Sequence, residues 1–532
     1  MKKILFSLMA IAVALVSCKK EEQIVPEIKA DKTEYQIPLA GTEEAEFFVE
    51  FTTNVDWTAK LKETYDWCTI VGSKGTAGEG KVKVIAEENK TNDERVAVVV
   101  VTAGVAQQEF KLIQAQVNKI ALVSESAEID SKGGEVELKV MTNIPYEVTI
   151  PEDVTWVKKA ATKAYGEQVT KLTVDAYSEF EPRAAKILVS AEGFEPLTFT
   201  VNQTGRATVS WVKKPATDWT GFVPANGARL AVYGDYVLLA NGSQILALNP
   251  ADGTVAQTIT LPEGMKAQSL CVDDAGNVIF AANAKWANDE TAEMLRLYTT
   301  KSLEQTPKLL VEYNSGNIWC GEMGNVRVSG NIEGNAVITA YASYSAFWMA
   351  WEVTNGVVGA LKYGTTPYTS NAFCGCVAPN GATLADGLWF IGYGGDYNLQ
   401  YCSDLANNTW SVAYVTGCGW MENNDCISVV KNGEKKYLAM IHSCHFNYDS
   451  PEVVVLDATQ ADKVEKFYTL NIYSQANWVE DGVDEDGNPK YINKDWTGAG
   501  TFSDACITEK DGVLYVYYID AQYGVAGCLK IE

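Results

Sequence analysis

Residues 235–261 read DYVLLANGSQILALNPADGTVAQTITL, and this stretch decides the fold class of the larger part of the chain. Three short apolar runs are separated by the turn-forming pairs Asn241-Gly242 and Asp252-Gly253. The stretch therefore predicts three antiparallel strands joined by tight turns. The same skeleton returns five times toward the C-terminus, with roughly 41 to 77 residues between copies.

Six copies of this unit predict a six-bladed β-propeller over residues 207–532. The spacing suits four-stranded blades that carry loop insertions. The sixth copy ends with three strands at Glu532, and its outermost strand is missing. The unassigned β run 207–212 is expected to supply that strand, which would close the ring and cover an exposed sheet edge.

The composition predicts a folded, all-β protein. The 532 residues are 47% apolar and include 14 Trp and 26 Tyr. Helical periodicity is almost absent after residue 30, whereas short β-type runs recur throughout. A formal net charge of −25 disfavours nucleic acid as a partner.

The first 17 residues are interpreted as a signal peptide. Two lysines precede the apolar run 4–16, which is shorter than the ~20 residues that a membrane-spanning helix needs. The run leads into the motif LVSC at residues 15–18, which resembles the lipobox of bacterial lipoproteins. The resemblance implies cleavage before Cys18 and lipidation of its thiol. An ordinary secretory signal with an incidental cysteine is the alternative.

Residues 18–29 are predicted to form a tether. The Lys-Lys-Glu-Glu sequence at residues 19–22 resembles the charged export tag that takes lipoproteins to the outside of the outer membrane in some Gram-negative anaerobes. We therefore expect an outer-membrane protein that is anchored by lipid and faces the cell exterior.

Residues 30–206 contain two copies of one module, offset by about 89 residues. Alternating apolar positions predict strands in each copy, and a module of about 90 residues with six or seven strands suits an immunoglobulin-like β-sandwich. The matched pairs are Asn54 with Asn143, Trp57 with Tyr146, Trp67 with Trp156, Arg95 with Arg183, Phe110 with Phe199 and Gln114 with Gln203.

The recurring residues resemble the BACON family. The resemblance implies two BACON-like β-sandwiches at residues 30–116 and 117–206, which either bind carbohydrate or act as spacers. Trp57 and Trp67 are interpreted as core residues, because Trp67 precedes the apolar strand end at Ile70. The two modules are therefore expected to serve as a stalk.

Aromatic residues gather in the predicted propeller loops. In a propeller, the loops between second and third strands share one face with the loops that join blades. Flat rings stack on sugar faces, and amides and carboxylates bind hydroxyl groups, so this face is predicted to bind a glycan. The predicted ligand-binding residues are Trp319, Tyr397, Trp420, Asn423, Asn424, Tyr448, Asp449 and Trp478, and Trp219, Tyr341 and Tyr523 belong to the same loops.

The sequence predicts no metal site and no cofactor. Residues 484–488 match a calcium loop only in part. Four cysteines stand at like positions in the first strands of different blades, too far apart for disulfides, and are interpreted as buried fillers. They are Cys271, Cys376, Cys426 and Cys506.

These features predict a surface lipoprotein that binds a polysaccharide or a glycoprotein glycan, and a glycan-uptake complex is a further candidate partner. A protein-binding adhesin or scaffold is the first alternative. A glycoside hydrolase or lyase is the second alternative, although no catalytic motif emerges. Asp396, Asp425 and Asp449 are candidate acids and bases only because acidic residues are abundant.

Overall fold

The regular structure of the chain is almost entirely β-strand, as the sequence predicts. The chain divides into two compact units, residues 1–176 with 184–202 and residues 177–183 with 203–532. Among the described residues, no helix has the length and apolar composition needed to cross a membrane. The computed structural model describes residues 24–42, 46–91, 93–159, 168–223, 228–285, 293–314, 322–343, 347–367, 375–392, 398–417, 426–442, 451–476, 478–483, 489–494 and 503–532.

The first module consists of two sheets around one hydrophobic core. Phe51, Trp57, Val99 and Phe110 lie in that core. One sheet has the order β1 (Ile28–Lys29), β3 (Phe47–Thr53), β7 (Gly78–Ala86), β5 (Cys68–Val71). The other has the order β2 (Glu34–Ile37), β9 (Ala106–Gln114), β8 (Arg95–Ala103), β4 (Trp57–Leu61), β6 (Lys74–Gly75).

The second module repeats this strand order. Leu138, Ile187 and Phe199 lie in its core. One sheet has the order β10 (Ile120–Leu122), β12 (Gly134–Thr142), β15 (Gln168–Val174), β14 (Val157–Lys159). The other has the order β11 (Ser126–Ile129), β17 (Leu197–Gln203), β16 (Arg183–Ser190), β13 (Glu147–Thr149).

The residues that recur in both modules stabilise the backbone. Arg95 Nε donates to Gln114 Oε1 at 2.9 Å, and Arg183 Nε makes the equivalent bond to Gln203 Oε1 at 2.9 Å. Trp57 is buried, whereas Trp67 is half-buried beneath the guanidinium of Arg95, 4.5 Å from the ring centre. The interpretation of Trp57 as a core residue is confirmed, and Trp67 packs at the edge of the same core.

The second unit contains six antiparallel sheets that each follow the predicted strand, turn, strand pattern. In the first five, consecutive strands pair in chain order. The first sheet is β19 (Leu230–Tyr233), β20 (Tyr236–Asn241), β21 (Gln244–Leu248), β22 (Val255–Thr260); the second is β23 (Ser269–Val272), β24 (Val278–Ala281), β26 (Met294–Thr300), β27 (Lys308–Asn314). The third is β28 (Glu322–Gly330), β29 (Ala336–Ala342), β30 (Phe347–Thr354), with β31 (Val357–Val358) and β32 (Lys362–Thr365) both beside β30 and β25 (Ala284–Lys285) beside β28. The fourth is β33 (Gly375–Pro379), β34 (Leu388–Gly392), β35 (Leu399–Asp404), β36 (Thr409–Tyr414); the fifth is β37 (Ser428–Asn432), β38 (Lys435–His442), β39 (Glu452–Asp457), β40 (Glu465–Asn471).

The sixth sheet joins the two ends of the second unit. Its order is β18 (Ala207–Lys213), β45 (Val525–Ile531), β44 (Val513–Asp520), β43 (Ser503–Lys510). β18 pairs antiparallel with β45, from Ala207 opposite Ile531 to Lys213 opposite Ala526. The prediction that the run 207–212 supplies the missing outer strand is confirmed.

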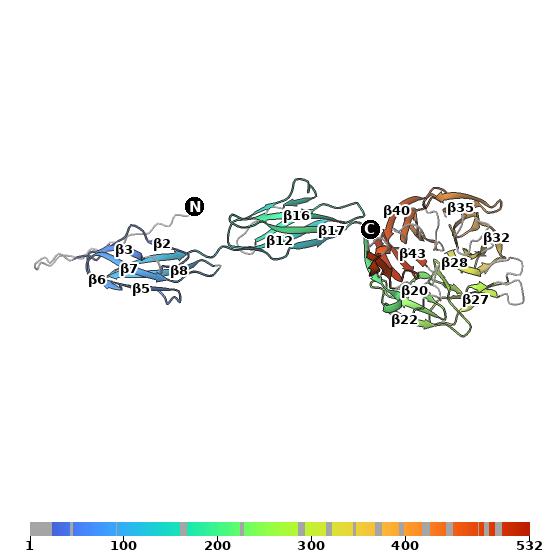
Figure 1. Ribbon diagram of the computed structural model, residues 1–532, viewed down its shortest axis with the longest axis horizontal. Coiled ribbons are helices and arrows are strands. Elements are labelled where there is room, and N and C mark those ends of the chain that lie inside the picture. Colours follow the sequence, from blue (N-terminus) through green and yellow to red (C-terminus); the bar gives the residue numbers. More distant parts are fainter. Residues whose placement is uncertain are drawn as a thin grey trace, which may run out of the picture. The chain divides into compact units, whose positions relative to one another are not determined.

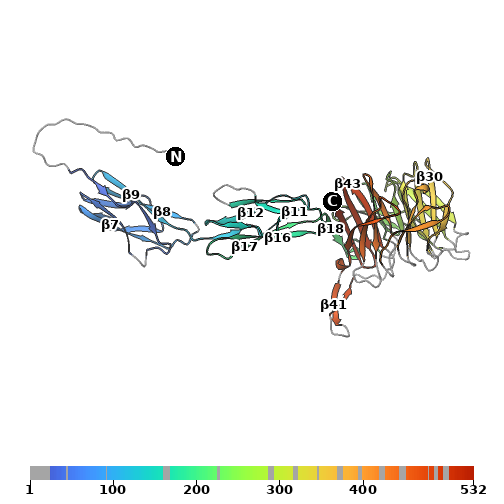
Figure 2. The same ribbon diagram turned by 90° about the horizontal axis from the view of Figure 1, so that it is seen from above.

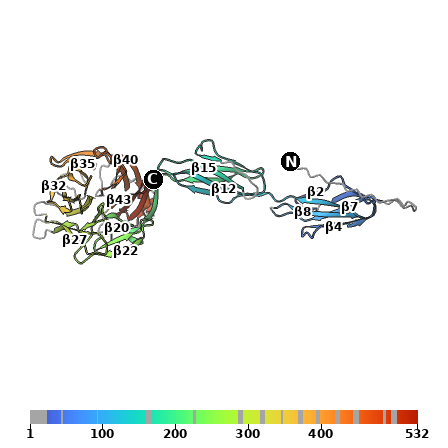
Figure 3. The same ribbon diagram turned by 180° about the vertical axis from the view of Figure 1, so that it is seen from behind.

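The six sheets stand around a common centre, with first strands inside and outer strands at the periphery (Figure 1). β19 lies beside β23 and β43, and β28 lies beside β23 and β33. The fourth, fifth and sixth sheets share one hydrophobic core. β22, β27, β35 and β40 also lie at the periphery when the unit is seen from behind (Figure 3). Because neighbouring sheets cover both faces, a second strand such as β34 is buried at every position.

The four repeated cysteines lie near this centre and form no disulfide with one another. Cys271, Cys376 and Cys426 are buried, and Cys506 is partly buried. Burial raises the pKa of Cys271 to about 12 and that of Cys506 to about 11, so both thiols stay protonated at neutral pH. Their interpretation as fillers is confirmed for the three buried cysteines; Cys506 retains some exposure.

Candidate functional site

The strands that flank the predicted ligand-binding segments meet at one end of the six sheets. Second strands end there and third strands begin there, and each fourth strand leads from there to the next first strand. Trp319 falls between β27 and β28, and Tyr397 falls between β34 and β35. The region between β36 and β37 holds Trp420, Asn423 and Asn424, and the region between β38 and β39 holds Tyr448 and Asp449.

Trp478 is the one predicted ligand-binding residue that belongs to the described part of the chain. The predicted lipidation site Cys18 and the calcium-like residues 484–488 lie outside the described residues. Also outside them are Trp319, Tyr397, Trp420, Asn423, Asn424, Tyr448 and Asp449, and the candidate carboxylates Asp396, Asp425 and Asp449.

Trp478 begins a projecting hairpin and is half-buried. The hairpin is formed by β41 (Trp478–Val483) and β42 (Pro489–Asn493), and it extends away from the sheets (Figure 2). The indole packs on the ring of Tyr473 with 4.5 Å between ring centres. Trp478 Nε1 donates to the carbonyl oxygen of Tyr473 at 2.8 Å, which fixes the orientation of the indole.

Two tyrosines complete an aromatic cluster with Trp478. Tyr523 lies between β44 and β45, and its ring centre is 6.0 Å from that of Tyr473. Asn493 Nδ2 donates to the carbonyl oxygen of Tyr523 at 2.9 Å and so ties the hairpin to the sixth sheet. We call Tyr473, Trp478 and Tyr523 the aromatic cluster; all three are half-buried, so their rings remain partly accessible.

Polar side chains beneath the aromatic cluster hold it in place. The hydroxyl of Tyr518 donates to Gln475 Oε1 at 2.8 Å. Gln475 belongs to the same short helix as Tyr473, which spans Tyr473–Gln475. Burial raises the pKa of Tyr518, so it remains a neutral donor at physiological pH. Asp520 Oδ1 accepts from the amide of Tyr523 at 2.9 Å.

Two loop aromatics predicted for this face are core residues instead. Trp219 is only 2% exposed, and its Nε1 donates to the carbonyl oxygen of Gly253 at 2.7 Å. Tyr341 is 3% exposed and packs 5.7 Å from Phe390, between ring centres. Both rings fill space between neighbouring sheets, which the loop assignment alone could not reveal. Tyr473 was missed by the sequence reasoning, although it precedes Trp478 by five residues in the same insertion.

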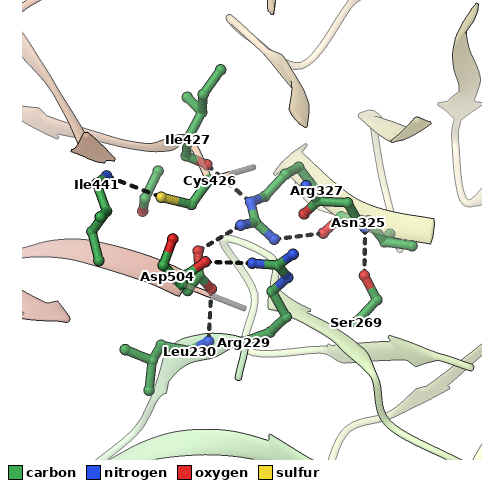
Figure 4. Close-up of polar contacts among 12 residues, drawn as sticks. Arg229, Leu230, Ser269, Asn325, Arg327, Cys426, Ile427, Ile441 and Asp504 are labelled. Atoms are coloured by element: carbon green, nitrogen blue, oxygen red, sulfur yellow. Dashed lines mark hydrogen bonds and ion pairs between the residues drawn. The ribbon is translucent and has the colours of Figure 1, made fainter. Parts of the chain in front are cut away.

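A buried ion pair crosses the centre of the six sheets near the same end (Figure 4). Arg327 of β28 in the third sheet meets Asp504 of β43 in the sixth, with 2.7 Å between Nη2 and Oδ1. Arg327 Nε donates to the carbonyl oxygen of Ile427 at 2.9 Å, and Asp504 Oδ2 accepts from the amide of Leu230 at 2.8 Å. Burial alone would lower the pKa of Arg327, but the charge of Asp504 raises it, and the net pKa lies above its usual value, so the guanidinium remains charged.

Arg327 and Asp504 therefore connect four of the six sheets through one buried network. Arg229, beside Leu230, adds a further bond from its Nη1 to the carbonyl oxygen of Ser503. Among the residues that the structure describes, no group of three or more His, Cys, Asp and Glu side chains is arranged to hold a metal ion.

Comparison with protein families gives two matches. Residues 221–532, more than half of the chain, match the family described as Domain of unknown function (DUF8500). Residues 56–115 match BACON, described as "Putative binding domain, N-terminal", which bears out the resemblance for the first module. No curated protein matches the chain.

Solved structures similar to the chain include three Bacteroides proteins. A DUF4623 family protein from Bacteroides eggerthii is 13% identical, over 89% of this chain and 98% of that chain, with a TM-score of 0.41. A structural genomics protein of unknown function from Bacteroides thetaiotaomicron is 11% identical, over 78% of this chain and 98% of that chain, with a TM-score of 0.38. A GH5 xyloglucanase from Bacteroides ovatus, in complex with a XXXG heptasaccharide, is 20% identical over 20% of this chain and 22% of that chain, with a TM-score of 0.15.

Proposed function

The chain belongs to the DUF8500 family of domains of unknown function, and we propose that it binds glycans through one end of a six-bladed β-propeller formed by residues 207–532. Six antiparallel sheets around one centre support this architecture, as does the completion of the last sheet by β18. The proposed binding face is the end of the sheets that carries the aromatic cluster.

The observation that carries the proposal is the half-buried aromatic cluster itself. Tyr473, Trp478 and Tyr523 come from two separate segments and meet at one end of the sixth sheet. The bond from Trp478 Nε1 to the backbone of Tyr473 holds the indole still, so a sugar that stacks on it meets a preorganised ring. The described strands on either side of the other predicted residues end on the same side, which supports the proposal.

The two N-terminal modules are proposed to be immunoglobulin-like spacers. Two sheets around one core in each module support that fold, and the BACON match associates the first module with carbohydrate-binding proteins. The recurring residues support a spacer role because they stabilise the fold of the module: the side chain of Arg95 donates a hydrogen bond to that of Gln114, and Trp57 is buried in the core.

A protein-binding adhesin or scaffold is the second candidate. The hairpin β41–β42 favours it, because this two-stranded sheet projects from the unit and leaves Val483 64% and Ile492 37% exposed. Exposed apolar side chains on a projecting element are typical of protein contacts.

The binding test is affinity electrophoresis of the full chain in gels that contain host or plant polysaccharides. We expect retardation in at least one polysaccharide, with no retardation of the fragment 30–206 in the same gel. Equal retardation of that fragment would transfer the binding role to the stalk, and an unretarded full chain in every gel would contradict glycan binding.

We also propose that the protein is a lipid-anchored protein of the outer membrane that faces the cell exterior. The motif at residues 15–18 and the charged residues 19–22 support this location. Replacement of Cys18 by Ala should abolish metabolic labelling with palmitate and release the protein from membranes. A Cys18→Ala protein that is still labelled to the wild-type level would rule out the anchor, and Cys68→Ala, at a buried thiol, is the matched control.

A further inference from the structure

A cavity of about 520 Å³ opens on the axis of the six sheets, at the end opposite to the aromatic cluster. The first strand of every sheet contributes to its wall, which runs from Arg327 to the turns between first and second strands. The wall comprises residues 230–232, 270–274, 327–330, 378–382, 427–431 and 505–508, with Lys436 from β38 at the mouth. Backbone from all six sheets therefore surrounds one central space.

Alternate residues of each first strand direct their peptide groups toward this space. In an antiparallel pair, every second residue turns its N–H and C=O away from the partner strand. The amide of Asp273 donates to the carbonyl oxygen of Asn277 at 3.0 Å, so Val272, one residue earlier, turns its N–H and C=O away from β24. Because β24 lies on the outer side of β23 in the second sheet, these groups of Val272 face the axis.

Contacts in the fifth and sixth sheets show the same alternation. Arg327 Nε donates to the carbonyl oxygen of Ile427 at 2.9 Å, so Val429, two residues further along the chain, also faces the axis. The amide of Ile507 donates to Ser428 Oγ at 3.1 Å and thus points away from its own second strand, β44.

The first, third and fourth sheets repeat the pattern. The amide of Asn331 donates to the carbonyl oxygen of Asn335 at 2.9 Å, which turns the residue three positions earlier toward the axis. Leu230 and Val377 bond groups of other sheets and not their own second strands, so the residues two positions later face the axis as well. One residue of each first strand thus lies at this level, and we call these six the peptide ring: Val232, Val272, Val328, Pro379, Val429 and Ile507.

Three amides of the peptide ring have no acceptor in the described part of the chain. They belong to Val272, Val328 and Val429, which are all partly exposed. Pro379, by contrast, has no N–H, and the amide of Ile507 is already bonded. Carbonyl groups of the ring add acceptors, so the wall offers fixed donors and acceptors that need no rearrangement to meet a ligand.

The basic side chains of the wall are compensated by carboxylates. Arg327 pairs with Asp504 at the inner end of the cavity. Lys431 is exposed at the mouth and acts on Asp274, since partial burial raises the pKa of Asp274 and the charge of Lys431 opposes that rise. None of these charges is left to select an ion.

Lys436 and Asp273 are likewise held by the protein. Lys436 Nζ donates to the carbonyl oxygen and to Oδ1 of Asn380, and although burial lowers the pKa of Lys436, the charge of Asp386 raises it. The carboxylate of Asp273 accepts four hydrogen bonds from N–H groups, which are the backbone amides of Ala275, Asn277 and Ile332 and the side-chain amide of Asn277. Among the described residues, the cavity therefore presents no uncompensated charge of either sign.

From this geometry we infer that the axial cavity binds one neutral, polyhydroxylated ring, of the chemical class of a hexopyranose. The hydroxyl groups of such a ring radiate from its rim, and each can donate or accept, so they can meet N–H and C=O groups that converge from six sides. A charged ligand would bring an unmatched charge into a site whose own charges are already paired. An apolar ligand would leave the amides of the peptide ring without acceptors. The site is separate from the aromatic cluster, so it stands or falls independently of the proposed glycan face.

The first test is a ligand-observed NMR titration of the full chain with glucose and galactose, each compared with its uronate and its amino sugar. We expect saturable binding of at least one hexose. The uronate, which is anionic, and the amino sugar, which is mostly cationic at pH 7, should each bind about tenfold more weakly. Equal or tighter binding of a charged counterpart, or no binding of either hexose, would overturn the inference.

Proline substitution tests the peptide ring directly. Val429→Pro removes one axis-facing N–H and no bond of the ladder between β37 and β38, and Pro379 already occupies the equivalent position in the fourth sheet. Hexose affinity should fall about two- to twelvefold, as expected for the loss of one neutral hydrogen bond. Val415→Pro is the matched control, because Val415 is 66% exposed and lies outside the cavity wall; it should leave the affinity unchanged.

If Val429→Pro fails to fold, Val272→Pro in the second sheet must weaken hexose binding by a similar factor. Unchanged affinity in a folded variant of the peptide ring, or the same loss from Val415→Pro, would contradict the inference.

Soluble dextran and galactan distinguish the source of the sugar. Competition between the polymer and the free hexose would assign the cavity to the end of a glycan chain. Binding of the free hexose alone would assign it to a monosaccharide.

Discussion

Replacement of Asp504 by Ala should lower the free energy of unfolding of the six-sheet unit by about 3–5 kcal/mol. The side chains of Arg327 and Asp504 are 9% and 1% exposed, so removal of the carboxylate would leave a guanidinium buried without its counter-charge. The amide of Leu230 would also lose its acceptor. Guanidinium-induced unfolding followed by tryptophan fluorescence measures this unit, because 11 of the 14 tryptophans lie after residue 206.

Glu333→Ala is the matched control for Asp504→Ala. Glu333 pairs with Lys301 at 2.6 Å, but both side chains are about half exposed, so we expect no measurable change in unfolding. The double variant Arg327→Met with Asp504→Leu should lose less than Asp504→Ala alone, because it removes both charges of the pair together. If Asp504→Ala and Glu333→Ala have the same free energy of unfolding, the ion pair of Arg327 and Asp504 does not hold the sheets together.

Removal of β18 should destabilise the whole six-sheet unit. Residues 214–532 would lose the ladder between β18 and β45 and expose a new sheet edge. They would also lose Trp211, whose Nε1 donates to the carbonyl oxygen of Pro250 at 2.9 Å and thus links the sixth sheet to the first. We expect a loss of about 2 kcal/mol or more relative to residues 207–532, which corresponds to a fall in Tm of roughly 3 °C or more for a unit of this size.

Single substitutions in the full chain distinguish the loss of contacts made by β18 from an unspecific effect of shortening the chain. Trp211→Ala should lower the Tm, whereas Val212→Ala should not, since Val212 in the same strand is 39% exposed. A calorimetric scan of both variants gives the comparison. The same Tm for residues 214–532 and 207–532 would mean that the ring needs no closing strand.

The strands could be predicted from the sequence because their signals are local. Apolar runs bounded by Asn-Gly and Asp-Gly pairs predict three strands within residues 235–261, and the structure has Tyr236–Asn241, Gln244–Leu248 and Val255–Thr260 there. The pairing of β18 with β45 was predictable for a different reason. The predicted last sheet lacked its outer strand, and one β run before the first sheet had no assigned partner. Pairing the two covers an otherwise exposed sheet edge.

The buried network of Arg327 and Asp504 and the burial of the Trp219 and Tyr341 rings could not be predicted in this way. Arg327 and Asp504 are 177 residues apart in the chain and meet only because the third and sixth sheets face each other across the centre. Trp219 and Tyr341 were assigned to the same set of predicted loops as Trp478, yet they fill the space between neighbouring sheets. Whether a loop ring is a ligand platform or a core residue depends on neighbours that no local pattern encodes.

The measurement that tests glycan recognition most directly is the affinity of the full chain and of its tryptophan variants for one retarding polysaccharide. Trp478→Ala and Trp420→Ala should each weaken binding about 2- to 12-fold, if a stacked ring contributes about 0.5–1.5 kcal/mol. The double variant should be weaker than either single variant. Tyr363→Ala is the matched control, because Tyr363 is 51% exposed on β32 at the periphery of the third sheet, and its loss should leave the affinity unchanged. Full affinity in both tryptophan variants would contradict the account.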